Sequence, residues 1–580
     1  MVHFKFSLVL SAVLLTLMCY GIQVIAQPAE TSSEKKSTVI ESNCVAEITF
    51  RSILNYADPF NGVTLDVVFT DPQGVERTVP AFWAGEEVWR VRYASPLAGI
   101  HTFRSRCSDE QNSGLHGVSG RIVVKPYTVE NPLYRHGPIR VADDRRHFAY
   151  GDGTPFFWLG DTWWMALVKR LHWPNEFAEL VADRKAKGYT VVQLTAGLYG
   201  DLDQNFDERA EGDGGFPWTQ DFQRINPKYF EEADKRIFYL VEQGIVPCIV
   251  GSWGYWLNWL GEEKMKQHWR YLIARWGALP VVWCAAGETG MPWYLDPQPD
   301  IGAQRNAWTP IVKYIRDTDP FRRMLTTHPM HAARARDEVR DPYLLDFDMQ
   351  QSGHGTMPQG QAEIALSGWN YEPVMPSISG EARYENLTIK REWTSPEENL
   401  ADFEGLAMLG TRQARGAFWA HLLNSGCAGH TYGASGTFQF NREDWKFGQG
   451  FSGVDWGKTT WRDAMNLPGS KQLGLAKAML MTLPWHRMSP AVDLAQGAVS
   501  AAMDDAKTCA VIYTERDAVT VDLAQFAGKV SVRWFDPTNG EWVSIAKKAF
   551  QNKGSKTFKT PQRNAAGDPD WVVVITSLQK

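Results

Sequence analysis

The sequence predicts a multidomain chain in which a central (β/α)8 TIM barrel lies between an N-terminal and a C-terminal β-sandwich. Three observations lead to this prediction. With 580 residues, the chain is too long for one ordinary hydrophobic core. Short alternating apolar segments, separated by turn residues, fill both ends and are typical of β-sandwiches. In the middle, continuous apolar runs alternate with helical segments, which indicates parallel strands covered by helices.

The first 26 residues have the profile of a signal peptide. Lys5 supplies a positive charge, residues 6–20 form an apolar stretch, and Ala26 is a small residue suited to cleavage. We therefore expect the mature chain to be exported, either to the periplasm or out of the cell. Residues 27–42 are polar and aperiodic and are predicted to be a linker. No other stretch has the length and apolarity of a membrane span.

The N-terminal β-sandwich is predicted over residues 43–127. Its strands are expected at 45–50, 64–69, 88–93 and 120–124. Cys44 and Cys107 both fall in this module and could form a disulfide in an oxidising compartment, but the sequence alone leaves this open.

The barrel is predicted over residues 138–488. Its strands are expected at 155–162, 190–196, 245–251, 281–286, 323–327, 343–349, 373–378 and 416–422. Its clearest helices are expected at 175–187, 226–243, 262–276, 307–318 and 398–415. Gln193, inside the second strand, is expected to be a buried polar group that needs a hydrogen-bonding partner.

Residues 489–580 return to a β pattern and predict the C-terminal β-sandwich. Its strands are expected at 508–513, 519–523, 530–535 and 571–575. Neither flanking module contains a pair of carboxylates at strand ends, so both are expected to be dispensable for chemistry.

Two glutamates are the candidate catalytic pair. Glu288 lies between two glycines at the end of the fourth strand, and Glu381 follows a glycine at the end of the seventh. The carboxyl ends of barrel strands form the catalytic face, so the two side chains should meet there. Either residue alone would be interpreted as a solvated loop residue. Together they supply what acid/base hydrolysis of a glycoside requires.

Other side chains are expected around this pair. Asp161, at the end of the first strand, is equally well explained as an acceptor for a substrate hydroxyl or as a helix cap. His354 and His430 follow glycine-rich strand ends, and His328 follows the fifth strand, so these histidines are expected to face the substrate or the carboxylates. Of the 25 tryptophans, Trp253 is one of three at or just past strand ends that could stack on a sugar ring.

Several motifs of the chain resemble the apiosidase-like family of secreted glycoside hydrolases, which belongs to the retaining TIM-barrel clan. The matching segments are DGTPFFWLGDTWW at 152–164, QQSGH at 350–354, GEARYE at 380–385, GHTYG at 429–433 and LPGS at 467–470. The flanking β modules resemble the sandwich that commonly precedes such barrels and the module often labelled collagen-binding. With these motifs, Gln351, Tyr384 and Tyr432 join the expected substrate-binding residues.

The resemblance implies an acid/base after strand four and a nucleophile after strand seven. These positions are Glu288 and Glu381, respectively. One residue departs from the pattern, because many clan members carry Asn before the acid/base and this chain has Gly287. We therefore expect the contact to the 2-hydroxyl of the sugar to differ.

Composition limits the possible partners. A net charge of -6 and a pI near 6.1 give no basic surface for nucleic acid or an anionic membrane. No cysteine or histidine spacing suggests a metal site, and the expected chemistry needs no cofactor. We expect a secreted glycosidase that cleaves a complex plant or algal polysaccharide by a two-carboxylate, retaining mechanism. The alternative is a catalytically inactive carbohydrate- or matrix-binding protein, and the presence of both glutamates favours the enzyme.

Overall fold

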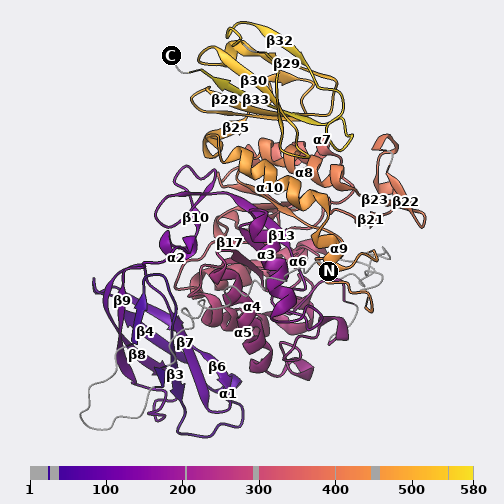
Figure 1. The fold of residues 1–580 in the computed structure, drawn as a ribbon. Helices are drawn as coiled ribbons and strands as arrows, with labels where there is room; N and C mark the ends of the chain where they lie inside the picture. The colour runs from indigo at the N-terminus through magenta and orange to yellow at the C-terminus, as the bar shows by residue number, and fades with distance from the viewer. Residues whose placement is uncertain are drawn as a thin grey trace, which may run out of the picture.

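The computed structural model describes residues 24–25, 38–202, 206–291, 300–398, 400–445, 457–546 and 548–578. An N-terminal β module, a central module of strands and helices, and a C-terminal β module follow one another along the chain (Figure 1). Most of the predicted signal peptide and linker lies outside the described residues. Of the signal peptide, β1 (Val24–Ile25) is described and pairs in parallel with β3 (Ala46–Arg51).

The N-terminal module consists of two β-sheets with strand orders β1-β3-β7-β6 and β2-β9-β8-β4-β5. Its other elements are β2 (Thr38–Glu41), α1 (Pro59–Gly62), β4 (Leu65–Thr70), β5 (Glu76–Pro80), β6 (Phe82–Gly85), β7 (Val88–Tyr93), β8 (Gly99–Cys107) and β9 (Ser119–Lys125). Inward-facing side chains of both sheets, including Phe50, Phe69 and Trp89, form one buried core. Cys44 and Cys107 are not joined by a disulfide.

The central module is built on one sheet in which eight parallel strands follow chain order. They are β13 (Trp158–Thr162), β14 (Val191–Thr195), β15 (Val246–Val250), β16 (Val282–Cys284), β17 (Leu325–Thr326), β19 (Asp348–Gln351), β20 (Ser377–Glu381) and β24 (Gly429–Tyr432). The first strand, β13, pairs directly with the eighth, β24. Every residue of these eight strands is buried, as expected for parallel strands covered by helices.

The ladder is interrupted between the fifth and sixth strands. Among the described residues, β17 and β19 share no ladder pairing. Single hydrogen bonds join the segments instead. The Asp346 N–H donates to the Leu325 carbonyl at 2.8 Å, the Leu325 N–H donates to Asp346 Oδ2 at 2.8 Å, and Thr326 Oγ1 donates to the Phe347 carbonyl at 2.9 Å. A short strand, β18 (Ala333–Arg334), pairs antiparallel with β19.

Helices lie around this sheet. They are α3 (Asn175–Ala186), α4 (Pro227–Glu242), α5 (Trp256–Trp276), α6 (Ile301–Thr318), α7 (Pro358–Trp369), α8 (Thr411–Asn424), α9 (Trp461–Met465) and α10 (Pro468–Leu480). Smaller elements are α2 (Pro132–Arg135), the sheet of β10 (Arg140–Val141), β11 (Phe148–Ala149) and β12 (Pro155–Phe156), and the sheet of β21 (Thr388–Ile389), β22 (Ala401–Phe403) and β23 (Leu406–Met408).

The predicted eighth strand at 416–422 is wrong, because these residues lie inside α8 and the eighth strand is β24. The sixth strand also begins later than predicted, and α7 was not predicted. The error over α8 has a physical cause. Phe418 and Trp419 are buried, as is nearly every residue of that helix, and a helix buried on all sides has the same apolar run as a buried strand.

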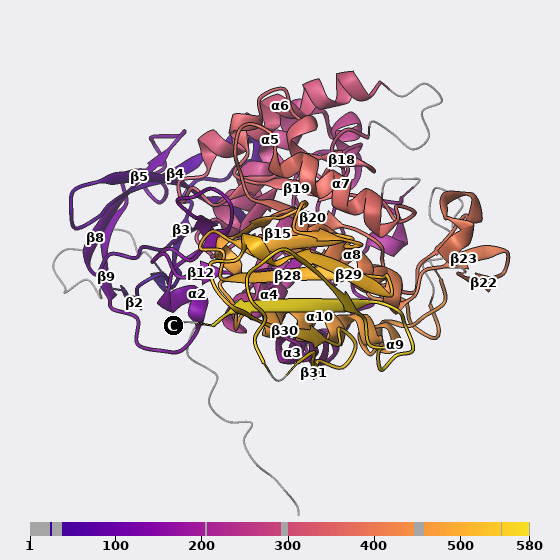
Figure 2. The ribbon, with the colours of Figure 1, turned by 90° about the horizontal axis from the view of Figure 1, so that it is seen from above.

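The C-terminal module contains a six-stranded sheet, β25-β27-β28-β33-β30-β31, and a three-stranded sheet, β26-β29-β32. Its strands are β25 (Met488–Pro490), β26 (Ala495–Gln496), β27 (Ser500–Asp504), β28 (Cys509–Thr514), β29 (Ala518–Asp522), β30 (Val530–Phe535), β31 (Trp542–Ser544), β32 (Ser555–Lys559) and β33 (Trp571–Ser577). Seen from above, the larger sheet covers α8 and α10 (Figure 2). Leu422 and Leu473 of these helices share one buried core with Val511 and Phe535 of the sheet. Removing the module would expose that core, so it contributes to the folding of the central module.

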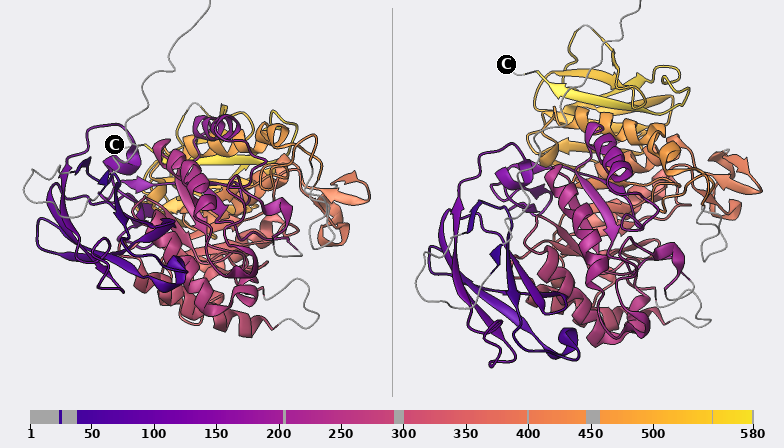
Figure 3. Two further views of the ribbon diagram at one scale, coloured as in Figure 1. Left: turned by 90° about the horizontal axis from the view of Figure 1, so that it is seen from below. Right: turned by 60° about the horizontal axis from the view of Figure 1, so that its bottom comes forward.

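The N-terminal module packs beside α4 and α5 (Figure 3) and is joined to them through a buried charge cluster. Asp234 on α4 accepts hydrogen bonds from Arg92 of β7 at 2.5 and 3.1 Å and from Arg275 of α5 at 2.8 and 3.0 Å. The Trp276 indole donates to it at 2.7 Å. Burial raises the pKa of Asp234, but the charges of Arg275 and Arg92 outweigh burial and lower it to about 2.

We expect Asp234→Ala to destabilise the protein by about 3–5 kcal/mol, because it leaves two buried guanidinium groups short of a carboxylate. Urea denaturation followed by tryptophan fluorescence would measure the loss. The native carboxylate has a lowered pKa, so its contribution is complete above pH ~4 and disappears as the pH falls towards 2. Asp317→Ala is the control, because the exposed Asp317–Lys313 pair should contribute less than about 1 kcal/mol. Equal midpoints for the two variants would contradict the prediction.

Candidate active site

Glu288 follows β16 in a tight turn. Its backbone φ of 42° lies in the left-handed region, which costs a residue with a side chain about 1–2 kcal/mol. The Trp253 indole Nε1 donates to Glu288 Oε2 at 3.2 Å, and the Gln351 amide Nε2 donates to Oε1 at 3.2 Å. Both oxygens of this partly buried carboxylate therefore have a donor.

Gly287 is required by the position of Trp253. A Cβ atom on Gly287 would lie 2.3 Å from the indole ring of Trp253, which is closer than carbon atoms can approach. The backbone of the two segments is also joined, because the Gly287 N–H donates to the Ser252 carbonyl at 2.9 Å. The space that an asparagine side chain would need at position 287 is thus filled by an indole, which explains the departure seen in the sequence.

Glu381 ends β20 and lies between two histidines. His328 Nε2 is 3.2 Å from Glu381 Oε2, and His354 Nε2 is 3.0 Å from Oε1. The backbone register places Gln351 of β19 opposite Glu381. Because the side chain of Gln351 reaches Glu288, this residue links the two glutamates.

The second nitrogen of each histidine also faces an acceptor. His328 Nδ1 is 3.0 Å from the Pro329 carbonyl, and His354 Nδ1 is 2.7 Å from the Ala382 carbonyl. A carbonyl can only accept, so Nδ1 carries a proton in both rings. A favourable contact between Nε2 and an ionised Glu381 then requires a proton on Nε2 as well. The arrangement therefore favours imidazolium rings next to a carboxylate.

The pKa values of Glu381 and His354 agree with this charge arrangement. Burial raises the pKa of Glu381, but the contacts from His328 and His354 outweigh it and lower that pKa to about 2. Burial lowers the pKa of His354, and the contact with Glu381 more than compensates, so that its pKa is raised overall. Glu381 is therefore ionised at any pH at which the protein is expected to work.

Aromatic rings surround the two carboxylates. The Trp164 ring lies 5.3 Å from that of Trp253 and 5.4 Å from that of His328, in both cases edge to face. The Tyr384 ring lies 4.7 Å from that of His354. Burial, and then the charge of Glu381, raise the pKa of the Tyr384 hydroxyl well above its usual value, so this group is neutral.

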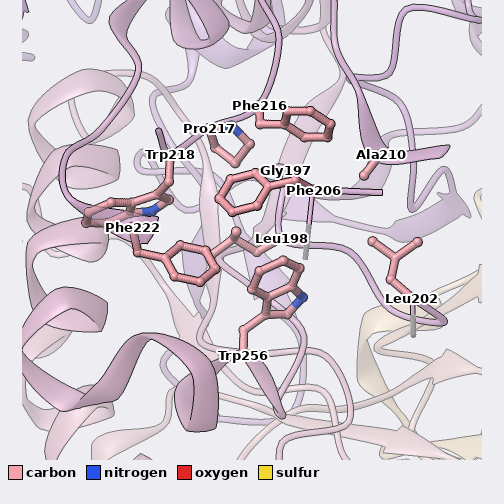
Figure 4. A pocket seen from close by; sticks show the side chains of 10 residues that line it. All are labelled: Gly197, Leu198, Leu202, Phe206, Ala210, Phe216, Pro217, Trp218, Phe222 and Trp256. Carbon is pink, nitrogen blue, oxygen red and sulfur yellow. The ribbon is translucent and has the colours of Figure 1, made fainter. Parts of the chain in front are cut away.

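The loop after β14 holds a third carboxyl group, Asp201, at the same place. Aromatic and apolar side chains of this loop gather against Trp256, line a small pocket and belong to the main core of the central module (Figure 4). The Trp256 indole and the Tyr255 hydroxyl both donate to the Tyr199 carbonyl, at 2.8 and 2.9 Å. The next residue, Gly200, lies against Trp253, since a Cβ atom there would be 2.7 Å from the indole.

The charges of both catalytic candidates, Glu288 and Glu381, influence the pKa of Asp201. Burial raises its pKa to about 7, and the negative charges of Glu288 and Glu381 act in the same direction. Arg209 and His354 oppose this shift without cancelling it. We therefore expect the ionisation of Asp201 to change near neutral pH.

Asp161 lies away from this group of residues. It is fully buried and accepts from Arg184 Nε at 2.5 Å and from the Trp163 indole at 2.6 Å. Arg184 belongs to α3, so Asp161 faces the helix layer. Asp161 therefore connects β13 to α3, and it acts neither as a substrate contact nor as a helix cap.

His430 and Tyr432 of β24 also face the helices. The His430 ring packs 5.3 Å from Phe418 of α8, and the Tyr432 hydroxyl donates to Glu385 at 2.5 Å. Thr431, between them, faces the opposite side and donates to Gln193 Oε1 at 3.3 Å. Gln193 Nε2 donates to the Gly380 carbonyl at 2.9 Å, so this buried amide has the partners that its sequence position called for.

The structure thus brings together Glu288, Glu381, Trp253, His328, Gln351, His354 and Tyr384. Three further residues of the site were not expected: Trp164, Asp201 and His331. The exposed His331 packs against Gly353, which directly precedes His354. A Cβ atom on Gly353 would lie 2.1 Å from the His331 ring. Only Trp164 had a signal in the sequence, since it ends the first family motif.

The part of the chain that the structure describes contains no cluster of histidine, cysteine or acidic residues that could hold a metal ion. Over the same ranges, no helix is both long enough and apolar enough to cross a membrane.

Two solved structures of glycoside hydrolases have a fold similar to that of this chain. A glycoside hydrolase family 5 protein from Bacteroides vulgatus shares 22% identity with a TM-score of 0.64, covering 78% of this chain and 95% of that one. A "putative glycoside hydrolase" from the same organism shares 16% identity with a TM-score of 0.66, covering 94% and 100%. At these identities the likeness concerns the fold, which is that of glycoside hydrolases. No protein of curated function matches the chain.

Family models identify the chain more closely. The model described as "Apiosidase-like, catalytic domain" matches residues 142–487. The chain therefore belongs to the apiosidase-like family, and it is a glycoside hydrolase. A "Domain of unknown function (DUF5060)" matches residues 41–108, and a "Putative collagen-binding domain of a collagenase" matches residues 493–576. The resemblance of the central module to this family is confirmed, and each flanking module matches a family model of its own.

Proposed function

We propose that this apiosidase-like hydrolase is an exported enzyme that cleaves glycosidic bonds of a complex plant or algal polysaccharide by a retaining mechanism. The observation that carries the proposal is the link through Gln351, which lies opposite Glu381 in the sheet and donates to Glu288. We also propose that the eight parallel strands form a complete (β/α)8 barrel. The bonds from Asp346 and Thr326 across the interrupted ladder support this closure.

In the first step, ionised Glu381 attacks the anomeric carbon while Glu288 gives its proton to the departing glycosidic oxygen. In the second step, Glu288 takes a proton from water, the water oxygen attacks the same carbon, and the bond to Glu381 breaks. The contacts from His328 and His354 keep Glu381 ionised for the attack. The negative charge of Glu381 favours the protonated form of Glu288, whereas the donors Trp253 and Gln351 favour its ionised form. Glu288 is thereby suited to alternate between acid and base.

Asp201 is proposed to tune this acid. Its ionisation near pH 7 adds negative charge beside Glu288 and so favours the protonated form of Glu288.

Polysaccharide panels read by released sugars would test the overall function, and NMR of the anomer formed first would test retention. A folded protein that releases no sugar from any plant or algal polysaccharide would favour the non-catalytic binding alternative.

We expect Asp201→Asn to move the alkaline limb of the kcat/KM profile to lower pH by about 0.5–1 unit, because a neutral amide no longer supports protonation of the acid. The acidic limb should not move, since Asp201 is already neutral at the pH where Glu381 titrates. Activity measured from pH 2 to 9, with folding checked at each pH, would cover both limbs. A shift of both limbs, or of neither, would rule out this role.

A further inference from the structure

The segment between β21 and β22 is bonded to the loop that follows Glu381 and packs against the loop that carries His354. The β21–β23 sheet projects from the body of the molecule (Figure 2). Arg383, two residues after Glu381, forms a buried ion pair with Glu398 at 2.5 and 2.8 Å. The same guanidinium donates to the Gly355 carbonyl at 3.0 Å. One arginine therefore fixes both this segment and the loop that carries His354.

Trp393 lies where this segment meets the active site. A Cβ atom on Gly355 would be 2.3 Å from the Trp393 carbonyl oxygen and 3.2 Å from its Cβ, so the two residues are packed together. Gly355 directly follows His354, whose Nε2 lies 3.0 Å from Glu381. Trp393 is thus at the rim of the site, next to the residue that contacts the proposed nucleophile.

The exposure of Trp393 is unusual for this protein. Its side chain is 45% exposed, whereas Trp253 and Trp164 inside the site are 4% and 7% exposed. Lys390 Nζ lies 5.2 Å from the centre of the Trp393 ring. Among the described residues, no carboxylate lies within ion-pairing distance of Lys390. A solvated indole with a cation beside it offers an apolar face together with a hydrogen-bond donor.

We propose that Trp393 and Lys390 form an outer sugar-binding subsite. The indole would stack on the apolar face of a sugar ring away from the cleavage point, and Lys390 would donate to a hydroxyl or carboxylate of that ring. The substrate would then be a chain of at least three sugars. This inference rests on the proposed function, because it extends the same site along the same substrate.

The test uses the full chain with Glu381→Gln, so that bound oligosaccharides stay intact. Xylo-, manno-, cello- and galacturono-oligosaccharides of two to six units are titrated by calorimetry. We expect affinity to rise with length, and Trp393→Ala to weaken binding of the longer chains about tenfold. Trp393→Phe should retain most of the affinity. Trp542→Ala is the matched control, because Trp542 is 38% exposed but lies in the C-terminal module.

Two readouts separate a subsite from a structural role. With wild-type Glu381, Trp393→Ala should raise KM for long chains and leave hydrolysis of a 4-nitrophenyl monosaccharide unchanged. Loss of affinity in high salt only for galacturonate chains would show that Lys390 contacts a carboxylate, and no salt effect would show a hydroxyl contact. Affinity that does not depend on length, absent binding, or equal loss on small and long substrates would overturn the subsite. Binding that depends on Trp393 without any hydrolysis would overturn the proposed function alone.

Discussion

Glu381→Gln is expected to abolish turnover, with kcat falling by several powers of ten, on the order of 10⁴-fold or more. An amide cannot form the covalent bond to the anomeric carbon, and the neighbouring rings of His328 and His354 lose the carboxylate that they contact. Steady-state kinetics on the polysaccharide identified by the panel would measure the loss.

Folding has to be controlled in this experiment, because Glu381 is 6% exposed and its removal changes a buried charge cluster. Circular dichroism and the thermal midpoint should stay close to those of the wild type. Glu363→Gln on α7 is the matched control, since Glu363 is exposed and its substitution should leave kcat unchanged. Near-wild-type activity of a folded Glu381→Gln variant would exclude this residue as the nucleophile.

The second large effect is expected for Glu288→Ala. General acid catalysis contributes about 10²–10⁴-fold, so hydrolysis of the polysaccharide should fall by that factor. Aryl glycosides with good leaving groups need no proton and should lose much less in the first step. Azide, which attacks without needing a base, should restore part of the rate and form a glycosyl azide with the configuration of the substrate.

A uniform loss for good and poor leaving groups would contradict this role for Glu288. The proposed mechanism also requires retention of configuration. The two outcomes differ in geometry, because an inverting enzyme needs its carboxyl groups ~6.5–9.5 Å apart and a retaining one only ~5–5.5 Å. Product NMR in the first minutes of the reaction would decide between them. An inverted first product would replace the covalent step with direct attack by water.

The sequence locates the candidate pair, Glu288 and Glu381, at strand ends because that signal is local. A buried apolar run followed by glycine and glutamate defines both a strand end and a side chain at the catalytic face. Asp161, His430 and Tyr432 were misplaced for an equally local reason. Successive residues on a strand face opposite sides, so proximity to a strand end does not decide whether a side chain faces the interior or the helices.

The sequence did not indicate Asp201 or His331 as residues of the site. Both belong to loops whose course depends on contacts made elsewhere, such as the bonds from Tyr255 and Trp256 to the Tyr199 carbonyl. The strand assigned to 416–422 failed because apolar periodicity does not distinguish a fully buried helix from a buried strand. Tertiary packing, rather than local preference, determined each of these features.

The pairing of β13 with β24 has a consequence for how the chain reaches its folded state. Trp158 on the first strand donates to Thr431 on the eighth, which lies 273 residues further along the chain. Contacts between such distant segments form late, because the intervening chain must lose its freedom first. During synthesis, the first strand therefore remains without its neighbour until almost the entire central module has emerged. Its apolar surface is open to association with other chains for that time, so we expect a holding chaperone to raise the yield of folded protein.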